Sequence, residues 1–335
     1  MTSLRTLGDL LAIVPYLLGF HPADSAVVLG LRDKKIIFQV RGDLPPPADV
    51  TVFAEHYAEI VARQRATRAV VLGYGAGPVV TPVVLALRAA LTGRGVPVVD
   101  VLRIADGRYW SYLCHEPTCC PPEGRPYDVA SSPVAAAAVV EGCVALPSRK
   151  ALEGRLAPVR GPARRAMDEA TRRANQRMVE LLEAEPKDPG RALHRAGLAA
   201  VDAAVARQRT GGRLTDDELA WLCVLLVYLP VRDYAWESVG GDLGIHVGLW
   251  TDVLRRGAPE LIAAPATLLS FAAWRAGEGA VASIALSRAL DADPEYRMAL
   301  LMSHALAGGV APSEWAAAAQ EQPTAMVRTR PPRIR

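Results

Sequence analysis

The order of strand-length and helix-length apolar runs constrains the fold of this chain most, because the two kinds alternate only in its first part. A strand run at 68–72, a helical run at 79–91 and a second strand run at 96–104 follow one another. This order predicts two parallel strands joined by a crossover helix. After residue 128 only helical spacing remains. The sequence therefore predicts an α/β domain over 1–128 and an all-helical domain over 129–318.

Further runs complete the predicted α/β domain. Helical spacing over 3–18 predicts a first helix, with Ser3 or Thr6 as its N-cap. Two β-rich runs, 25–31 and 35–40, flank a charged triplet and predict a hairpin. Two more elements are expected, a helix over 52–65 and a strand over 108–113. The expected fold of this domain is a mixed sheet that contains the hairpin and the strand–helix–strand (βαβ) unit.

The helical domain is predicted from a series of apolar runs with helical period. They lie at 132–144, 162–184, 189–208, 215–228 and 243–255. Thr215 and Glu218 have the spacing of a capping box, which marks the start of the fourth run as a helix. Small and apolar residues over 261–294 resemble one tetratricopeptide repeat pair, and a single unit predicts no repeat array. The arginines and prolines of 319–335 predict a mobile tail.

Composition narrows the class of protein and its compartment. With 335 residues, 51% of them hydrophobic and 22% charged, the chain is globular and long enough for two cores. A formal charge of +3 is too small to indicate a nucleic-acid partner, although the arginines of the tail keep such an association as a weaker alternative. Asp9 and Pro15 interrupt the first apolar patch, so no signal peptide is expected. The longest apolar runs, at 219–231 and 261–274, are too short to cross a bilayer, so a cytoplasmic protein without a membrane partner is expected.

The stretch 109–128 differs most from its surroundings, because it holds three of the five cysteines, one histidine and four prolines. Cys114, His115, Cys119 and Cys120 are enough for a tetrahedral zinc site. Adjacent pairs are not the usual zinc spacing, which places two residues between paired cysteines. A reactive thiol is a second interpretation. Buried structural thiols beneath a proline-stiffened loop are the favoured one, because free cysteine is often buried.

A glycine-rich turn follows the strand run at 68–72. Gly73, Gly75 and Gly77 lie between a predicted strand and a predicted helix, where backbone N–H groups can hold a phosphate or another anion. The spacing lacks the last glycine of a G-x-G-x-x-G motif and the lysine of a P-loop. A tight turn without a ligand is therefore the alternative interpretation, and it is favoured.

Polar residues gather at the predicted strand ends. They are Asp24 and Ser25 before the first strand, and Arg41, Asp43, Tyr74, Arg103, Asp106 and Arg108 after the others. Asp24 comes near the rest only if the hairpin folds toward them. Arginine beside aspartate in a cleft can bind a carboxylate or phosphate and tune a general acid or base, so Asp24, Arg41, Asp43, Asp106 and Arg108 are the catalytic candidates. Arg41 and Asp43 are equally suited to an ion pair that closes a loop, and this structural interpretation is favoured. His21 is expected to be a turn residue.

Three segments together resemble a known family. They are VPYLLGFHPADSAVVLGL, FQVRGDLPP and DGRYWSYLCHEPTCCPPEGRPYD. The chain resembles, over nearly its whole length, the actinobacterial family called domain of unknown function DUF4192. The resemblance implies a bacterial, cytosolic protein and supplies neither a reaction nor catalytic residues.

Two classes of function follow from these residues. The leading hypothesis is a module that binds a small anionic ligand through the α/β domain and a protein partner through the C-terminal helices. The alternative is a hydrolase or transferase that acts on a small anionic substrate at the strand ends, with or without zinc at the cysteine loop. Nothing in the sequence establishes catalysis, since it has no nucleophile elbow, no H-E-x-x-H and no Walker motif.

Overall fold

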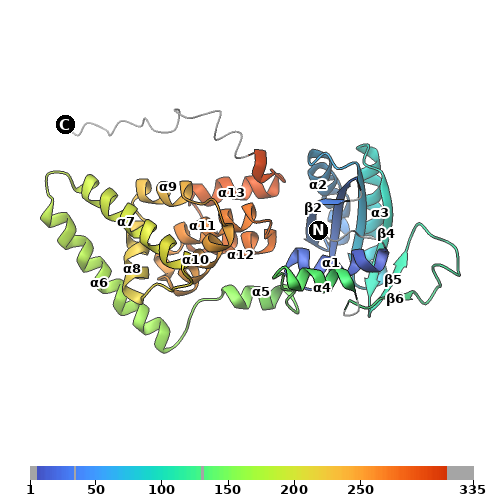
Figure 1. Cartoon of the computed structure of the whole chain (residues 1–335). Coiled ribbons are helices and arrows are strands. Elements are labelled where there is room, and N and C mark those ends of the chain that lie inside the picture. Colours follow the sequence, from blue (N-terminus) through green and yellow to red (C-terminus); the bar gives the residue numbers. More distant parts are fainter. Residues whose placement is uncertain (1–5, 34, 130–131, 315–335) are drawn as a thin grey trace.

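The computed structural model of the chain describes residues 6–33, 35–129 and 132–314. In Figure 1 the sheet and the helices that cover it lie at the right of the molecule, and helices α6 to α13 lie at the left. A six-stranded sheet occupies the first part of the chain and helices follow it, so the predicted α/β and helical regions are confirmed. Ser3, Lys34 of the predicted hairpin turn and the predicted tail at 319–335 lie outside the described residues.

The sheet has the strand order β2-β1-β3-β4-β5-β6. Its strands are β1 (Ser25–Arg32), β2 (Lys35–Asp43), β3 (Arg68–Tyr74), β4 (Val98–Ala105), β5 (Arg108–Ser111) and β6 (Arg125–Pro126). β1 and β2 form the predicted antiparallel hairpin, and β3 and β4 are parallel, as predicted for the βαβ unit. β1 also pairs antiparallel with β3. The start of β1 therefore lies at the same edge of the sheet as the ends of β2, β3 and β4.

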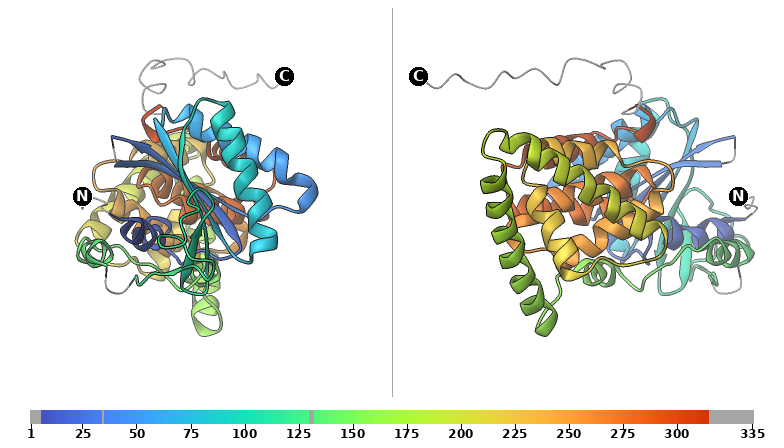
Figure 2. Two further views of the ribbon diagram at one scale, coloured as in Figure 1. Left: turned by 90° about the vertical axis from the view of Figure 1, so that its right-hand side faces the viewer. Right: turned by 60° about the vertical axis from the view of Figure 1, so that its left-hand side comes forward.

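Helices cover both faces of the sheet, as the left view of Figure 2 shows. They are α1 (Leu7–Leu18), α2 (Val50–Arg63), which follows a short 3₁₀ turn η1 (Pro47–Asp49), and α3 (Gly77–Gly93). On one face Leu11 of α1 packs with Val27 and Leu72. On the other face α2 and α3 cover Val28 and Val71. Neighbouring residues of β1 thus enter two different apolar layers, which explains why this strand is a continuous apolar run.

Local signals set the ends of α1. Thr6 is the N-cap, and its side-chain oxygen and the carboxylate of Asp9 each accept the other residue's backbone N–H at 3.1 Å. Gly19 ends the helix with φ of 79°, a left-handed conformation that glycine adopts readily. Of the two N-caps that the sequence offers, Thr6 is the one used.

The chain keeps contact with the α/β region beyond the predicted boundary at residue 128. α4 (Pro133–Val140) packs against α1, and Phe20 forms a β-bridge with Leu146. The helix predicted over 132–144 ends earlier, because the backbone turns at Gly142 with φ of 85°. The division of the chain at residue 128 stays a prediction.

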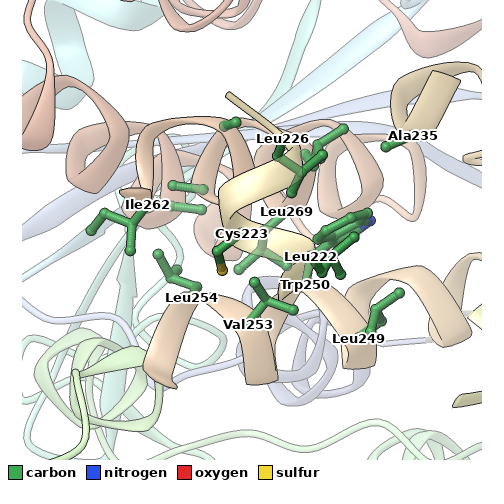
Figure 3. Packing of buried hydrophobic residues seen from close by; sticks show 14 of the residues in the cluster. Leu222, Cys223, Leu226, Ala235, Leu249, Trp250, Val253, Leu254, Ile262 and Leu269 are labelled. Carbon is green, nitrogen blue, oxygen red and sulfur yellow. The ribbon is translucent and has the colours of Figure 1, made fainter. Parts of the chain in front are cut away.

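The helical region is built around one large core. Its helices are α5 (Arg149–Leu156), α6 (Pro162–Ala184), α7 (Pro189–Arg209), α8 (Asp216–Leu225), α9 (Leu229–Glu237), α10 (Leu243–Arg256), α11 (Ala263–Arg275), α12 (Gly279–Ala292) and α13 (Arg297–Ala307), with a 3₁₀ turn η2 (Pro259–Leu261) before α11. In Figure 3, Leu222 and Cys223 of α8 pack with Trp250 and Val253 of α10 and with Leu269 of α11. α11 is buried from Ala264 to Trp274, so it forms the centre of this region.

The helix predicted over 215–228 is shorter in the structure, and a helix that was not predicted follows it. The capping box of Thr215 and Glu218 begins α8 as predicted. α8 ends at Leu225, and α9 continues at an angle of 110° to it. Pro230 lies in the first turn of α9, where proline is tolerated because the N–H it lacks would be unpaired there. Within the described residues no single helix is long and apolar enough to cross a membrane, and only this bent pair meets the criterion jointly.

The contacts between the two regions include Phe20 and the end of α2. Phe20, which follows α1, belongs to the core of the helical region. At the end of α2, Arg63 donates a hydrogen bond to the carbonyl of Gly308 at 2.7 Å, and Gln64 donates to the carbonyl of Gly309. The chain after α13 is therefore held against α2.

Candidate functional site

A cleft of about 580 Å³ opens at the edge of the sheet where β3 and β4 end. Its walls come from α1, from residues 21–24 before β1, from residues 74–77 after β3, from the turn after β4 and from Tyr127. The register places Ser25 opposite both Tyr74 and Asp43, so the condition on which Asp24 was a candidate, a hairpin that folds toward the other strand ends, is met. The cleft thus lies where ligands bind in open α/β sheets.

Asp24 and Asp106 line this cleft with left-handed backbones, at φ of 42° and 50°. Asp106 and Gly107 form the two-residue turn between β4 and β5, which requires positive φ at both positions. Asp24 lies in no such hairpin turn, and its conformation costs roughly 1–2 kcal/mol. Both side chains are exposed, and within the described residues neither carboxylate has a hydrogen bond or ion pair. Both are therefore available to a ligand.

Gly75 lets Asp24 approach the turn after β3. Gly75 has φ of 135°, and a Cβ atom there would lie 3.2 Å from Oδ1 of Asp24. Any other residue would be strained in this conformation and would crowd the carboxylate. Gly75 and Gly77 both line the cleft. Gly73 instead lies in β3 beneath α3, where a Cβ atom would be 2.3 Å from Val80, so its role is close packing.

Arg103 brings a positive charge to the start of α3. Its guanidinium stacks on the ring of Trp110 at 3.6 Å. It also lies 3.7–3.8 Å from the position that a Cβ atom of Gly77 would occupy. Ala76 is the N-cap of α3 and offers no side chain to the first N–H groups of the helix. The start of a helix carries a partial positive charge. Within the described residues Arg103 has no carboxylate partner, so its charge adds to that of the helix.

Tyr74 lines the cleft and has a buried hydroxyl. The residue is 7% exposed, and its hydroxyl has no hydrogen-bond partner within the described part of the chain. Burial raises the pKa of Tyr74 well above its usual value, and the nearby Tyr127 adds to this effect. Ser25, opposite Tyr74 in the sheet, likewise has a buried hydroxyl without a partner among these residues. A buried hydroxyl without a hydrogen-bond partner lowers the stability of the folded state by about 1–3 kcal/mol. Two such hydroxyls beside each other therefore call for a structural or functional explanation.

Three catalytic candidates from the sequence do not line the cleft. Arg41 and Asp43 form an ion pair of 2.6 Å, and Arg149 approaches Asp43 at 3.8 Å. Arg108 donates a hydrogen bond to the carbonyl of Gly124 at 2.8 Å and so holds the loop before β6. The interpretation of Arg41 and Asp43 as a loop closure fits this geometry. Whether any of the five candidates is catalytic stays a prediction.

Two residues of the cleft wall carry no signal in the sequence. His21, expected to be only a turn residue, lines the cleft from the loop before β1. Tyr127 follows the two-residue strand β6, which is too short to show a period. Both lie at the site only because the order of the strands brings these two loops to the end of the sheet where β3 and β4 end.

The cysteine loop between β5 and β6 holds a second cluster. The Sγ atoms of Cys114, Cys119 and Cys120 lie within 4.8 Å of one another, and His115 is outside the group. Cys119 is exposed and the other two are half-buried, so the interpretation as buried structural thiols is wrong for this loop. The N–H of Glu116 and then the thiol of Cys120 lower the pKa of Cys114. Partial burial and the two neighbouring thiols raise the pKa of Cys120 to about 12.

The helical region has a hollow of its own. It measures about 340 Å³ and lies between α6, α7 and α8. Alanines of α7 form much of its wall, and Trp221 lies at one side with the guanidinium of Arg177 at 4.3 Å from its ring. A protein partner at the C-terminal helices stays a prediction.

Comparison with known proteins gives one match. A family model described as a domain of unknown function (DUF4192) matches residues 8–313. No curated protein and no solved structure matches the chain. The matched residues include both the cleft and the cysteine loop.

Proposed function

Because the chain belongs to the DUF4192 family, whose description assigns no activity, we propose from its cleft that the protein binds a small molecule carrying an anionic group and a hydroxyl or amino group. The volume of about 580 Å³ is within the range of sites for small ligands. The buried, unpartnered hydroxyl of Tyr74 carries this proposal, because a ligand that reaches it would supply the missing hydrogen bond.

The anionic group of the ligand would lie at the start of α3. Arg103 and the first N–H groups of the helix converge there, and Gly77 leaves room for close approach. Guanidinium and helix N-termini together favour phosphate or carboxylate. Stacking on Trp110 holds the guanidinium in place before a ligand arrives, which lowers the entropy lost on binding.

Other residues that line the cleft would bind hydrogen-bond donors of the ligand. Ionised carboxylates accept hydrogen bonds only, so Asp24 and Asp106 suit hydroxyl or amino groups of the ligand. Tyr74 lies in the wall of the same cleft and can donate or accept. A ligand with both kinds of group would fill the cleft and pair charges of both signs.

A catalytic role is the second candidate, and the backbone of Asp24 favours it. A left-handed backbone at a residue other than glycine is strained and persists only where the surrounding structure holds it. Such residues cluster at active sites, and Asp24 has this conformation. In this case Asp24 and Asp106 would act as general base and acid of a hydrolase or transferase. Replacing either with asparagine should then abolish turnover of a bound compound without unfolding the protein. Turnover that persists in both variants would exclude this role.

The binding proposal is tested by thermal unfolding with a small panel of compounds. Ribose 5-phosphate, glycerol 3-phosphate, adenosine monophosphate and aspartate are compared with uncharged parent compounds. We expect at least one anion to raise the Tm while its parent does not. Arg103→Gln should remove the shift. Arg88→Gln is the matched control, because Arg88 is exposed on the same helix as Gly77 but does not line the cleft. Equal loss in both variants, or no shift with any anion, would contradict the proposal.

A further inference from the structure

We propose that Cys114, Cys119 and Cys120 bind one Zn²⁺ ion through three thiolates, with solvent at the fourth position. Within the described residues no other histidine, cysteine or carboxylate ligand atom joins this group. Three protein ligands and one open position are a common zinc arrangement. Soft thiolate ligands favour zinc over magnesium or calcium.

The distances suit one metal ion. With Zn–S bonds of about 2.3 Å, tetrahedral geometry places the sulfur atoms about 3.8 Å apart. The three Sγ atoms lie within 4.8 Å of one another, so side-chain rotation can bring them around an ion without refolding the loop. Binding releases the thiol protons to solvent, since the thiolate is the form that coordinates zinc.

One turn of the loop positions Cys114. The Oγ atom of Ser111 accepts hydrogen bonds from the N–H groups of Leu113 and Cys114, each at 3.1 Å. Ser111 in turn donates to the carboxylate of Asp100 at 2.7 Å. Cys114 is therefore fixed relative to β4, on which Asp100 lies.

A second turn positions the other two thiols. The carbonyl oxygen of Glu116 accepts the N–H of Cys119 at 3.0 Å and the N–H of Cys120 at 2.7 Å. Two adjacent cysteines usually project in different directions in an extended segment. This compact turn instead brings both sulfur atoms to Cys114.

The far end of the loop is fastened to β5. Trp110 donates its indole N–H to the carbonyl of Pro122 at 2.9 Å. Gly124, with φ of 78°, lies against the Trp110 ring, where a Cβ atom would be only 2.4 Å away. The loop, which projects from the sheet at the right of Figure 1, is thus held at both ends. Such ordering before binding favours metal affinity.

Elemental analysis of the purified full-length, untagged protein tests this site. We expect about one zinc ion per chain, and near-complete loss in Cys119→Ser. Cys119 is exposed, so this substitution removes no core packing, and circular dichroism should remain unchanged. Cys143→Ser is the matched control, because Cys143 is also an exposed free thiol but lies outside the cluster, and its zinc content should equal the wild type.

Two further measurements identify the ligands. His115→Ala should keep its zinc, because His115 is outside the cluster. With cobalt in place of zinc, the protein should show thiolate-to-metal charge-transfer absorption, and Cys114→Ser should weaken it. Absence of zinc in the wild type, or zinc retained in Cys119→Ser, would overturn the site. A disulfide within the cluster of the purified protein would overturn it as well. Zinc lost in His115→Ala would overturn the three-thiolate ligand set.

Discussion

Two groups of charged side chains lie at the same edge of the sheet and differ in what they contact. At the end of β2, Arg41 and Asp43 pair with each other. Before β1 and at the end of β4, Asp24, Arg103 and Asp106 line the cleft, and none of these three has an ion pair within the described residues. Residue type is the same in both groups. The difference shows that the neighbours of a charged residue at a strand end decide whether it closes a loop or stays available to a ligand.

Replacing each arginine with glutamine should separate the two groups most strongly. Arg103→Gln should weaken binding of an anionic ligand by about 1.5–3 kcal/mol, the range for hydrogen bonds to charged groups, or roughly 10- to 100-fold. Arg41→Gln should leave the affinity unchanged and lower the free energy of unfolding by up to about 1 kcal/mol. Isothermal titration and urea unfolding of both variants measure this. Equal affinities in the two variants would contradict the assignment of Arg103 to ligand binding and of Arg41 to the ion pair.

Tyr74→Phe should change stability and binding in opposite directions. Without a ligand the variant should be more stable by about 1 kcal/mol, because an unsatisfied buried hydroxyl is removed. Its ligand affinity should fall. Tyr112→Phe is the control with the opposite sign, since the Tyr112 hydroxyl bonds to Thr81 at 2.6 Å and its loss should destabilise by about 0.5–1.5 kcal/mol. Destabilisation by Tyr74→Phe would show that its hydroxyl already has a partner.

Asp100 differs from the cleft aspartates, because its carboxylate accepts hydrogen bonds within the protein and does not line the cleft. Burial raises the pKa of Asp100 above its usual 3.8, although hydrogen bonds from Ser111 and from the N–H of Val101 oppose the shift. The folded state then holds its proton to higher pH than the unfolded state. The contribution of Asp100 to the free energy of unfolding is therefore greatest below pH 3.8 and is lost as the pH rises through its raised pKa. Urea unfolding at several pH values should show this decline in the wild type and not in Asp100→Asn.

The smallest effect is expected at Asp43. The Asp43 side chain is 72% exposed and that of Arg41 is 10% exposed, so solvent screens the ion pair from the Asp43 side only. Asp43→Asn should lower the free energy of unfolding by less than about 0.5 kcal/mol and leave ligand affinity unchanged. Chemical unfolding and titration with the same ligand measure both quantities. A clear loss of affinity would place Asp43 functionally with the cleft residues.

Elements with a local cause could be predicted from the sequence. Thr215 and Glu218 mark the start of α8, and the run at 162–184 coincides with α6, because caps and helical period act within a few residues. α9 was not predicted, since the apolar run that contains α8 gives no sign of a bend after Leu225. Likewise β6 pairs only through Arg125 and Pro126, a length at which no period can be detected.

The candidate site was predictable in part for the same reason. Polar residues after strands and a glycine turn before a helix are local patterns, and they drew attention to Asp106, Gly75 and Gly77. His21 gave no pattern, because its place in the cleft depends on β1 lying beside β3. The three-thiol group depends on two successive turns whose hydrogen bonds the spacing of the cysteines does not reveal.

The sequence by itself determined the order of the longer strands and helices, the capping box of α8 and the family of this protein, because these depend on neighbouring residues and on the character of the whole chain. Only the tertiary structure decided which strand-end charges meet. Antiparallel pairing of β1 with β3 carries Asp24 to the end of β4, and the two-residue alternation of strands puts Tyr74 and Arg103 on opposite faces of the sheet, from which both reach the cleft at its edge. Strand order and register arise from packing between distant segments, which no local pattern encodes.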